Sequence, residues 1–134
     1  YYVRDPDMTL TASLDGMWET DAEIMPTALR TVPRREDWTE VLHGPATMDN
    51  VFTGWDGRAV IGFPSRGFAV EMTADAGWLV VYAPTSEAIA CIEPVTHPTD
   101  PFNDPAHDGL RLLAPGETTT LTTRFRVAAT GSRR

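Results

Sequence analysis

The chain has 134 residues and a mass of 14.7 kDa, with 42% hydrophobic and 22% charged residues, values typical of one packed domain rather than of a disordered segment. Nineteen acidic residues against eleven basic ones, all of them arginine, give a formal net charge of −8 and a pI near 4.7. This balance argues against binding to nucleic acid or to an anionic membrane surface, and the absence of lysine excludes a Schiff-base or phosphate-loop lysine in this sequence.

The pattern of apolar residues predicts strands along the whole chain. Eleven prolines and ten glycines interrupt the sequence too often for long helices. Alternating residues, or short runs of β-branched and aromatic residues, mark the expected strands. These are residues 8–14, 58–63, 67–73, 78–82, 88–92, 109–113 and 118–127. The second and third of them are expected to pair as a hairpin.

The segments between these strands predict turns, loops and at most one short helix. Asp15-Gly16 predicts a turn after the first strand, and Pro94–Pro105, with four prolines, predicts a long irregular loop. Residues 35–42 place three apolar side chains on one face, as a short helix does. Residues 128–134 are expected to form a flexible tail. We therefore expect one all-β domain over residues 1–134, an antiparallel β-sandwich.

Cysteine and histidine usage predicts neither a disulfide nor a bound metal or other cofactor. Cys91, the one cysteine, lies in an apolar run and is expected to be a buried, inert thiol. The three histidines are scattered rather than paired on one element. No apolar stretch is long enough to cross a bilayer and the given sequence does not start with a basic-then-apolar leader, so we expect a cytoplasmic protein. Because the first residue is not methionine, the chain is expected to be cut from, or to be part of, a longer one.

Two acidic positions are candidates for chemistry. Glu93 follows an apolar strand and precedes Pro94, and burial at the mouth of a sandwich raises the pKa of a carboxyl group toward that of a general base. Alternatively, Glu93 accepts hydrogen bonds from amides of the proline-rich turn. His97 is either a second acid or base or a solvated loop residue. Asp49, followed by Asn50 between apolar residues, is also typical of a turn that starts a strand.

Several short motifs, read together, resemble the C-terminal end of the aldose 1-epimerase (galactose mutarotase) family. They occur in the family's order and rough spacing over nearly the whole chain. The matching segments are Trp18–Thr27, Met48–Phe52, Leu79–Pro84, Ile89–Pro98 with its EPVT sequence, Phe102-Asn103, and Leu113–Glu117 with its PGE turn.

The resemblance implies a fold, a reaction and site residues. The fold is an incomplete part of a galactose-mutarotase-like supersandwich, and the reaction interconverts the α and β anomers of a free aldohexose without a cofactor. Glu93 takes the position of the general base and Asp49 that of a sugar-binding carboxylate. His97 and Tyr82 are further candidates for contacting the substrate.

The chain departs from the family's pattern in three places. The general-acid histidine belongs to a motif that would precede residue 1, so this chain alone is expected to be inactive and to need the missing N-terminal half or another chain. Val80 stands where many members carry Gln, and Ala28 where Gly is usual, which affects the sugar preferred more than the type of reaction.

An alternative function is a carbohydrate-binding β-sandwich without catalysis. Its tryptophans would stack on sugar rings, and the candidates are Trp18, Trp38, Trp55 and Trp78. A third alternative is a structural or dimerising β domain with no pocket.

Overall fold

The computed structural model describes residues 1–131, and nine strands supply nearly all the regular structure of that part of the chain. The strands are β1 (Tyr2–Val3), β2 (Thr9–Thr20), β3 (Pro26–Asp37), β4 (Met48–Thr53), β5 (Arg58–Phe63), β6 (Phe68–Ala74), β7 (Trp78–Ala83), β8 (Ile89–Val95) and β9 (Thr123–Ala129). Two single-turn 3₁₀ helices, η1 (Thr39–Leu42) and η2 (Pro64–Arg66), complete the set. The expected all-β class is confirmed.

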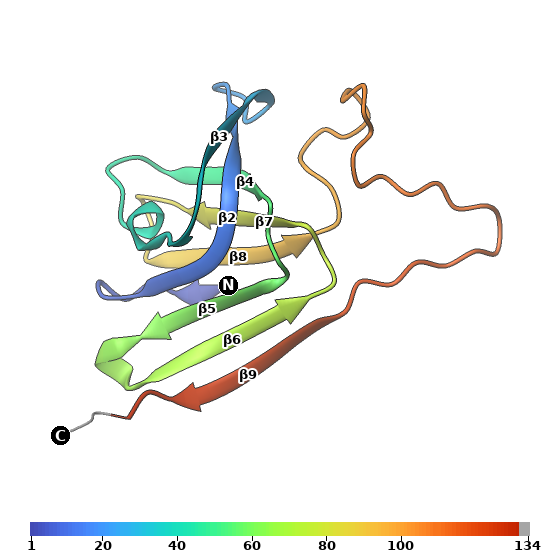
Figure 1. Ribbon diagram of the computed structural model, residues 1–134. Coiled ribbons are helices and arrows are strands. Elements are labelled where there is room, and N and C mark those ends of the chain that lie inside the picture. Colours follow the sequence, from blue (N-terminus) through green and yellow to red (C-terminus); the bar gives the residue numbers. More distant parts are fainter. Residues whose placement is uncertain (132–134) are drawn as a thin grey trace.

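The strands form one antiparallel sheet in the order β1-β8-β7-β4-β2-β5-β6-β9, and β3 pairs with β2 outside this path. The sheet curls into half of a barrel (Figure 1), as expected of an incomplete β-sandwich. The hairpin predicted around residues 64–67 is confirmed as β5 and β6. The strands expected at 78–82 and 88–92 correspond to β7 and β8, which run one and three residues further.

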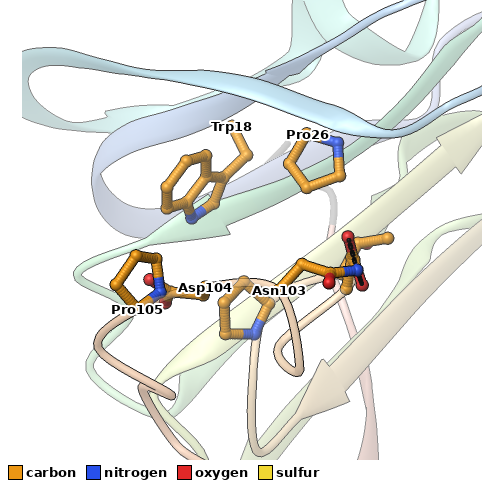
Figure 2. A pocket seen from close by; sticks show the side chains of 8 residues that line it. Trp18, Pro26, Asn103, Asp104 and Pro105 are labelled. Carbon is orange, nitrogen blue, oxygen red and sulfur yellow. Dashed lines mark hydrogen bonds between the residues drawn. The ribbon is translucent and has the colours of Figure 1, made fainter.

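The long connection between β8 and β9 has less regular structure than the sequence suggested. The strand expected over 109–113 is absent from the described chain, and the strand expected over 118–127 is shifted to β9. Because Ala128 and Ala129 pair with β6, the tail expected from residue 128 cannot begin before residue 130; residues 132–134 lie outside the described part. The connection faces Trp18 of β2 across a cleft (Figure 2).

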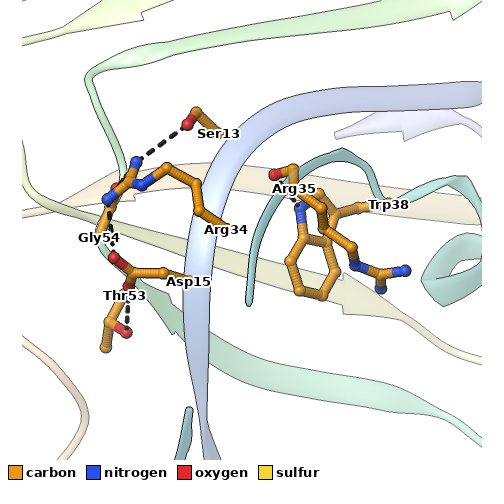
Figure 3. Close-up of polar contacts among 7 residues, drawn as sticks. All are labelled: Ser13, Asp15, Arg34, Arg35, Trp38, Thr53 and Gly54. Carbon is orange, nitrogen blue, oxygen red and sulfur yellow. Dashed lines mark hydrogen bonds and ion pairs between the residues drawn. The ribbon is translucent and has the colours of Figure 1, made fainter. Parts of the chain in front are cut away.

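Strand β2 continues through Asp15-Gly16, so the turn predicted there is wrong. Arg34 of β3 donates to the Asp15 carboxylate at 2.7 Å and to the main-chain oxygen of Gly54 at 2.9 Å, which ties three segments together (Figure 3). The pairing of β2 with β3 shifts register between Leu14 and Gly16. The dipeptide is therefore accommodated as an irregularity within the strand, where β2 changes partner from β5 to β4.

The segment from Pro26 to Leu42 also differs from expectation. Residues 26–37 form β3, which the sequence did not predict, because its side chains are nearly all exposed and do not alternate. The helix expected over residues 35–42 is reduced to η1, since residues 35–37 pair with β2 instead. Trp38 and Leu42 nevertheless contribute buried side chains to the core, as the shared apolar face predicted.

The core lies on one face of the curled sheet. The cross-strand row Ala12–Ala59–Met72 belongs to it, and Phe52 meets Trp38 edge-on, with 5.1 Å between ring centroids. The same row continues to Phe125 on β9, which is 60% exposed. In the described chain β9 pairs only with β6, so the sheet ends in an unpaired edge with exposed apolar side chains.

The N-terminal segment lies at the edge of the sheet opposite to β9. Tyr2 pairs with Ala90 in β8. The Arg4 guanidinium donates to three main-chain oxygens, those of Leu42, Pro84 and Glu87, at 3.1, 2.6 and 2.7 Å. One side chain thereby satisfies carbonyl groups of η1 and of the loop between β7 and β8.

Candidate functional site

The register of the central strands places four candidate side chains on one face of the sheet. Asp49 of β4 is opposite Tyr82 of β7, which is opposite Cys91 of β8. Glu93 lies two residues beyond Cys91 on the same strand. Side chains at alternate positions of a strand share a face, so Asp49, Tyr82, Cys91 and Glu93 lie together; we call this the carboxylate face.

Apolar residues at the alternate positions of these strands point to the opposite face of the sheet and are buried in the core. Phe52, Leu79 and Val81 are completely buried there, and Ile92 is nearly so. The strands that carry the two carboxylates are thus anchored by apolar packing behind them. Asp49-Asn50 lies within β4, so the alternative of an Asx turn at this point is wrong.

At the end of its apolar strand, Glu93 is expected to be the more deeply buried of the two carboxylates, and the structure shows the reverse. Glu93 is exposed, whereas Asp49 is partly buried and burial raises the pKa of its carboxyl group. Asp49 is on β4, which lies between β2 and β7, whereas Glu93 lies beyond the two residues of β8, Ile89 and Ala90, that pair with β1.

The spacing of the carboxylates follows from the pairing. Two strand spacings of about 4.8 Å and two residues of about 3.4 Å put the Cα atoms of Asp49 and Glu93 on the order of 12 Å apart. Both side chains project from the same face and can lean toward each other. A separation of roughly 5–10 Å between the carboxyl groups, suited to one hexose, stays a prediction.

His97 lies beside the carboxylate face. A hollow of about 310 Å³ is lined by Val51 and Val80, the neighbours in the next cross-strand row, and by His97 from the loop after β8. Val80 is directly opposite Glu93. The ring Nδ1 of His97 lies 2.9 Å from the main-chain oxygen of Pro98, which fixes the ring at the rim of the hollow.

Cys91 is the buried thiol that the sequence predicted, with 2% of its surface exposed. Burial raises the pKa of the thiol, and the charges of Glu93 and Asp49 raise it further. The thiol is therefore held protonated between the two carboxylates.

The four tryptophans divide into two pairs. Trp38 and Trp55 are buried in the core, and their indole N–H groups donate to the main-chain oxygens of Arg35 and Arg58. These two cannot be platforms for a sugar. Trp18 and Trp78 are partly exposed and line a common hollow on the same side of the sheet as the carboxylate face.

Two further properties bear on the type of site. Within residues 1–131, no three His, Cys, Asp or Glu side chains are grouped so that they could hold a metal ion. In that same range no helix is long and apolar enough to cross a membrane.

Comparison with known proteins finds a sequence match and a structural match in Escherichia coli K12. No model of a known protein family matches the chain. The chain is 28% identical over 138 residues to the "Uncharacterized protein YphB", and the match covers 95% of the chain and 48% of that protein. The crystal structure of a "Putative aldose 1-epimerase" superposes with a TM-score of 0.82 at 23% identity, over 96% of the chain and 48% of the other.

The chain thus spans about half the length of the proteins it matches, and it corresponds to roughly the C-terminal half of the solved structure. The likeness to an aldose 1-epimerase expected from the motifs is confirmed for the fold. An incomplete sandwich of this type also explains why one sheet carries a core on one face and an open edge at β9.

Proposed function

We propose that this chain is the C-terminal half of an aldose 1-epimerase-like isomerase, which interconverts the α and β anomers of a free aldose. The observation that best supports this is the register of β4, β7 and β8, which puts Asp49 and Glu93 on one face of the sheet. The fold shared with the solved neighbour adds weight, because the expected sugar-binding positions fall on that face.

In this mechanism Glu93 is the general base. Its carboxylate accepts the proton of the C1 hydroxyl, the electron pair forms the C1 carbonyl, and the bond from C1 to the ring oxygen breaks. The ring oxygen takes a proton from an acid. Rotation about the C1–C2 bond and the reverse steps close the ring with the opposite configuration at C1 and return the proton from Glu93.

Asp49, Tyr82 and His97 hold the sugar. Sugar hydroxyls are hydrogen-bond donors, and a bond to a carboxylate is roughly twice as strong as a neutral one. Asp49 therefore binds a ring hydroxyl, while Tyr82, beside it in the same cross-strand row, and His97, at the rim, contact the remaining polar groups.

The acid for the ring oxygen belongs to a segment that precedes residue 1, as the resemblance implies. Losing such a partner costs about 10²–10⁴-fold in rate, so this chain by itself is expected to be inactive. The preceding half, or another chain, also completes the sandwich. We place the whole protein in hexose metabolism in the cytoplasm.

The test is Glu93→Gln in the longer protein, which keeps the shape of the side chain and removes the proton acceptor. Polarimetry on freshly dissolved α-aldose is expected to show a fall in kcat of at least about a hundredfold, with sugar binding retained. Glu87→Gln, an exposed glutamate in the loop before β8, is the control and is expected to retain full activity. Full activity of Glu93→Gln would refute the mechanism.

A non-catalytic carbohydrate-binding protein is the second candidate, favoured by the half-buried position of Trp18 and Trp78 in one hollow. The same experiment separates the two functions. Binding of sugars by a longer protein that does not accelerate anomer interconversion at all would support the second.

A further inference from the structure

Arg4, the residue after β1, holds the turn that joins β7 to β8. Residues 84–88 form this turn. The Arg4 guanidinium donates to the main-chain oxygens of Pro84 and Glu87 at 2.6 and 2.7 Å, and the Arg4 main-chain N–H donates to that of Ala88 at 2.9 Å. Both ends of the turn are thus attached to one residue. Because the turn of a hairpin sets the register of its strands, Arg4 supports the alignment of β7 and β8 on the carboxylate face.

The same guanidinium also reaches the core. It donates to the main-chain oxygen of Leu42, the last residue of η1, at 3.1 Å, and the side chain of Leu42 is completely buried. Arg4 therefore connects β1, η1 and the turn before β8. A planar guanidinium offers several donors in fixed directions, which an apolar side chain of the same length does not.

The direction of β1 relates this attachment to Glu93. Strand β1 runs antiparallel to β8 at the edge of the sheet (Figure 1), with Tyr2 opposite Ala90. Each step back along β1 is therefore a step forward along β8. If this pairing continues in the longer protein, the residue two positions before Tyr1 lies opposite Glu93. Opposed residues have Cβ atoms about 4.5–5.5 Å apart on the same face.

The proposed reaction needs such an approach. Its base acts on the C1 hydroxyl and its acid on the ring oxygen, and both oxygens are bonded to the same carbon. The acid must therefore lie close to Glu93, and a segment that runs beside β8 toward this residue can supply it. Strand β1 itself pairs through only two residues, so its register on β8 needs further support.

We propose that Arg4 is a positioning residue for this reaction, which holds β1 in register on β8 so that the preceding segment presents its acid beside Glu93. The inference rests on the proposed function and deepens it, because it names the residue that aligns acid and base. Arg4 does not contact the sugar, since its guanidinium donates to main-chain oxygens at the end of β8 that is remote from Glu93.

The test is Arg4→Met in the longer protein, which keeps the apolar stem and removes the guanidinium. Polarimetry on freshly dissolved α-aldose is carried out well below the Tm of wild type and variant, so that both are folded. We expect kcat to fall at least about tenfold, as part of the 10²–10⁴-fold that a general acid contributes. KM should change by less than about twofold, because Asp49 lies on the central strand β4.

Arg66→Met is the matched control. Arg66 donates to the carboxylate of Asp5, the residue after Arg4, at 2.7 Å. This substitution also loosens the N-terminal segment, but at η2 rather than at the turn before β8, so kcat should be retained. A residue that only stabilised the fold would lower the Tm in both variants and leave kcat unchanged in both.

Hydrogen exchange followed by mass spectrometry gives a readout that does not depend on activity. The amides of residues 1–4 and of the segment before them are expected to exchange at least about tenfold faster in Arg4→Met than in wild type or Arg66→Met. The proposal is overturned if these rates are unchanged, or if Arg4→Met keeps the wild-type kcat while Glu93→Gln loses activity. It is also overturned if Arg66→Met lowers kcat equally. If the wild-type longer protein does not interconvert anomers, the proposed function itself fails.

Discussion

Replacing Asp49 by asparagine is expected to stabilise the fold at neutral pH while weakening the sugar site. Asp49 lies in a central strand, and burial raises the pKa of its carboxyl group. The folded protein therefore holds this proton more tightly than the unfolded chain does. A carboxyl group with a raised pKa favours folding below its unfolded pKa, near 3.8, and that contribution is lost as the pH rises through the folded-state pKa.

The size of the effect follows from the exposure of the side chain. Asp49 is only partly buried, so solvent screens most of the penalty and the gain for Asp49→Asn is less than about 1 kcal/mol. For a domain of this length that is a rise in Tm of up to about 4 °C. The difference between variant and wild type is expected to be near zero in acid and to grow to a plateau above the folded-state pKa.

Urea denaturation followed by circular dichroism, from about pH 3 to about pH 8, measures this difference. Glu87→Gln, at an exposed loop position, serves as the control for loss of one negative charge. A variant that is less stable than wild type at neutral pH, or a difference that does not change with pH, would refute the reasoning. In the longer protein Asp49→Asn should also raise KM, because it weakens a contact made in both ground and transition states.

Two further substitutions test the architecture that carries the site. Gly54→Ala is expected to cost roughly 1–3 kcal/mol of unfolding free energy, because the φ angle is +68° and the new Cβ would clash with the Asp15 carboxylate of β2. Gly67→Ala, at φ +71° with open space around it, should cost clearly less, and equal losses in thermal denaturation would count against the clash. Arg4→Met, which keeps the apolar stem but removes the donors to three carbonyls, is expected to cost about 1–3 kcal/mol, and Arg111→Met, with one exposed hydrogen bond, should be close to neutral in the same assay.

The strands that the sequence predicted well are those with one face in the core. Residues 67–73 alternate in sequence because side chains such as Val70 and Met72 are buried at every second position, and residues 58–63 form a short apolar run; both patterns are visible without a structure. Strand β3 shows no such pattern, since its residues are exposed on both faces and it is stabilised by pairing with β2. The Asp15-Gly16 pair reads as a turn because its partners, Arg34 and Gly54, come from distant parts of the sequence.

In the candidate site, too, local sequence identified some features, while others depend on the pairing of distant strands. Motif resemblance singled out Asp49 and Glu93, but their common face depends on strand register, which local sequence does not determine. Their relative burial was predicted wrongly, because it depends on which strands flank β4 and β8. Asp104, in the loop that faces Trp18, was not identified as a candidate residue from the sequence, because a loop aspartate near prolines has no distinctive local signal.

The connection from β8 to β9 forms one side of the cleft beside Trp18, which Pro98, Asn103 and Asp104 line. It begins close to one margin of the sheet, beside Glu93, and ends at the other, where Thr122 donates its N–H to the Asp75 carboxylate at 2.6 Å before β9 pairs with β6. Residues 96–122 are therefore a long connection whose two ends are both held by the sheet. Loss of the pairing between β9 and β6 would free one end of this connection and give it much greater conformational freedom. The position of the loop residues that face Trp18 therefore depends on β9, at the edge of the sheet distant from β8.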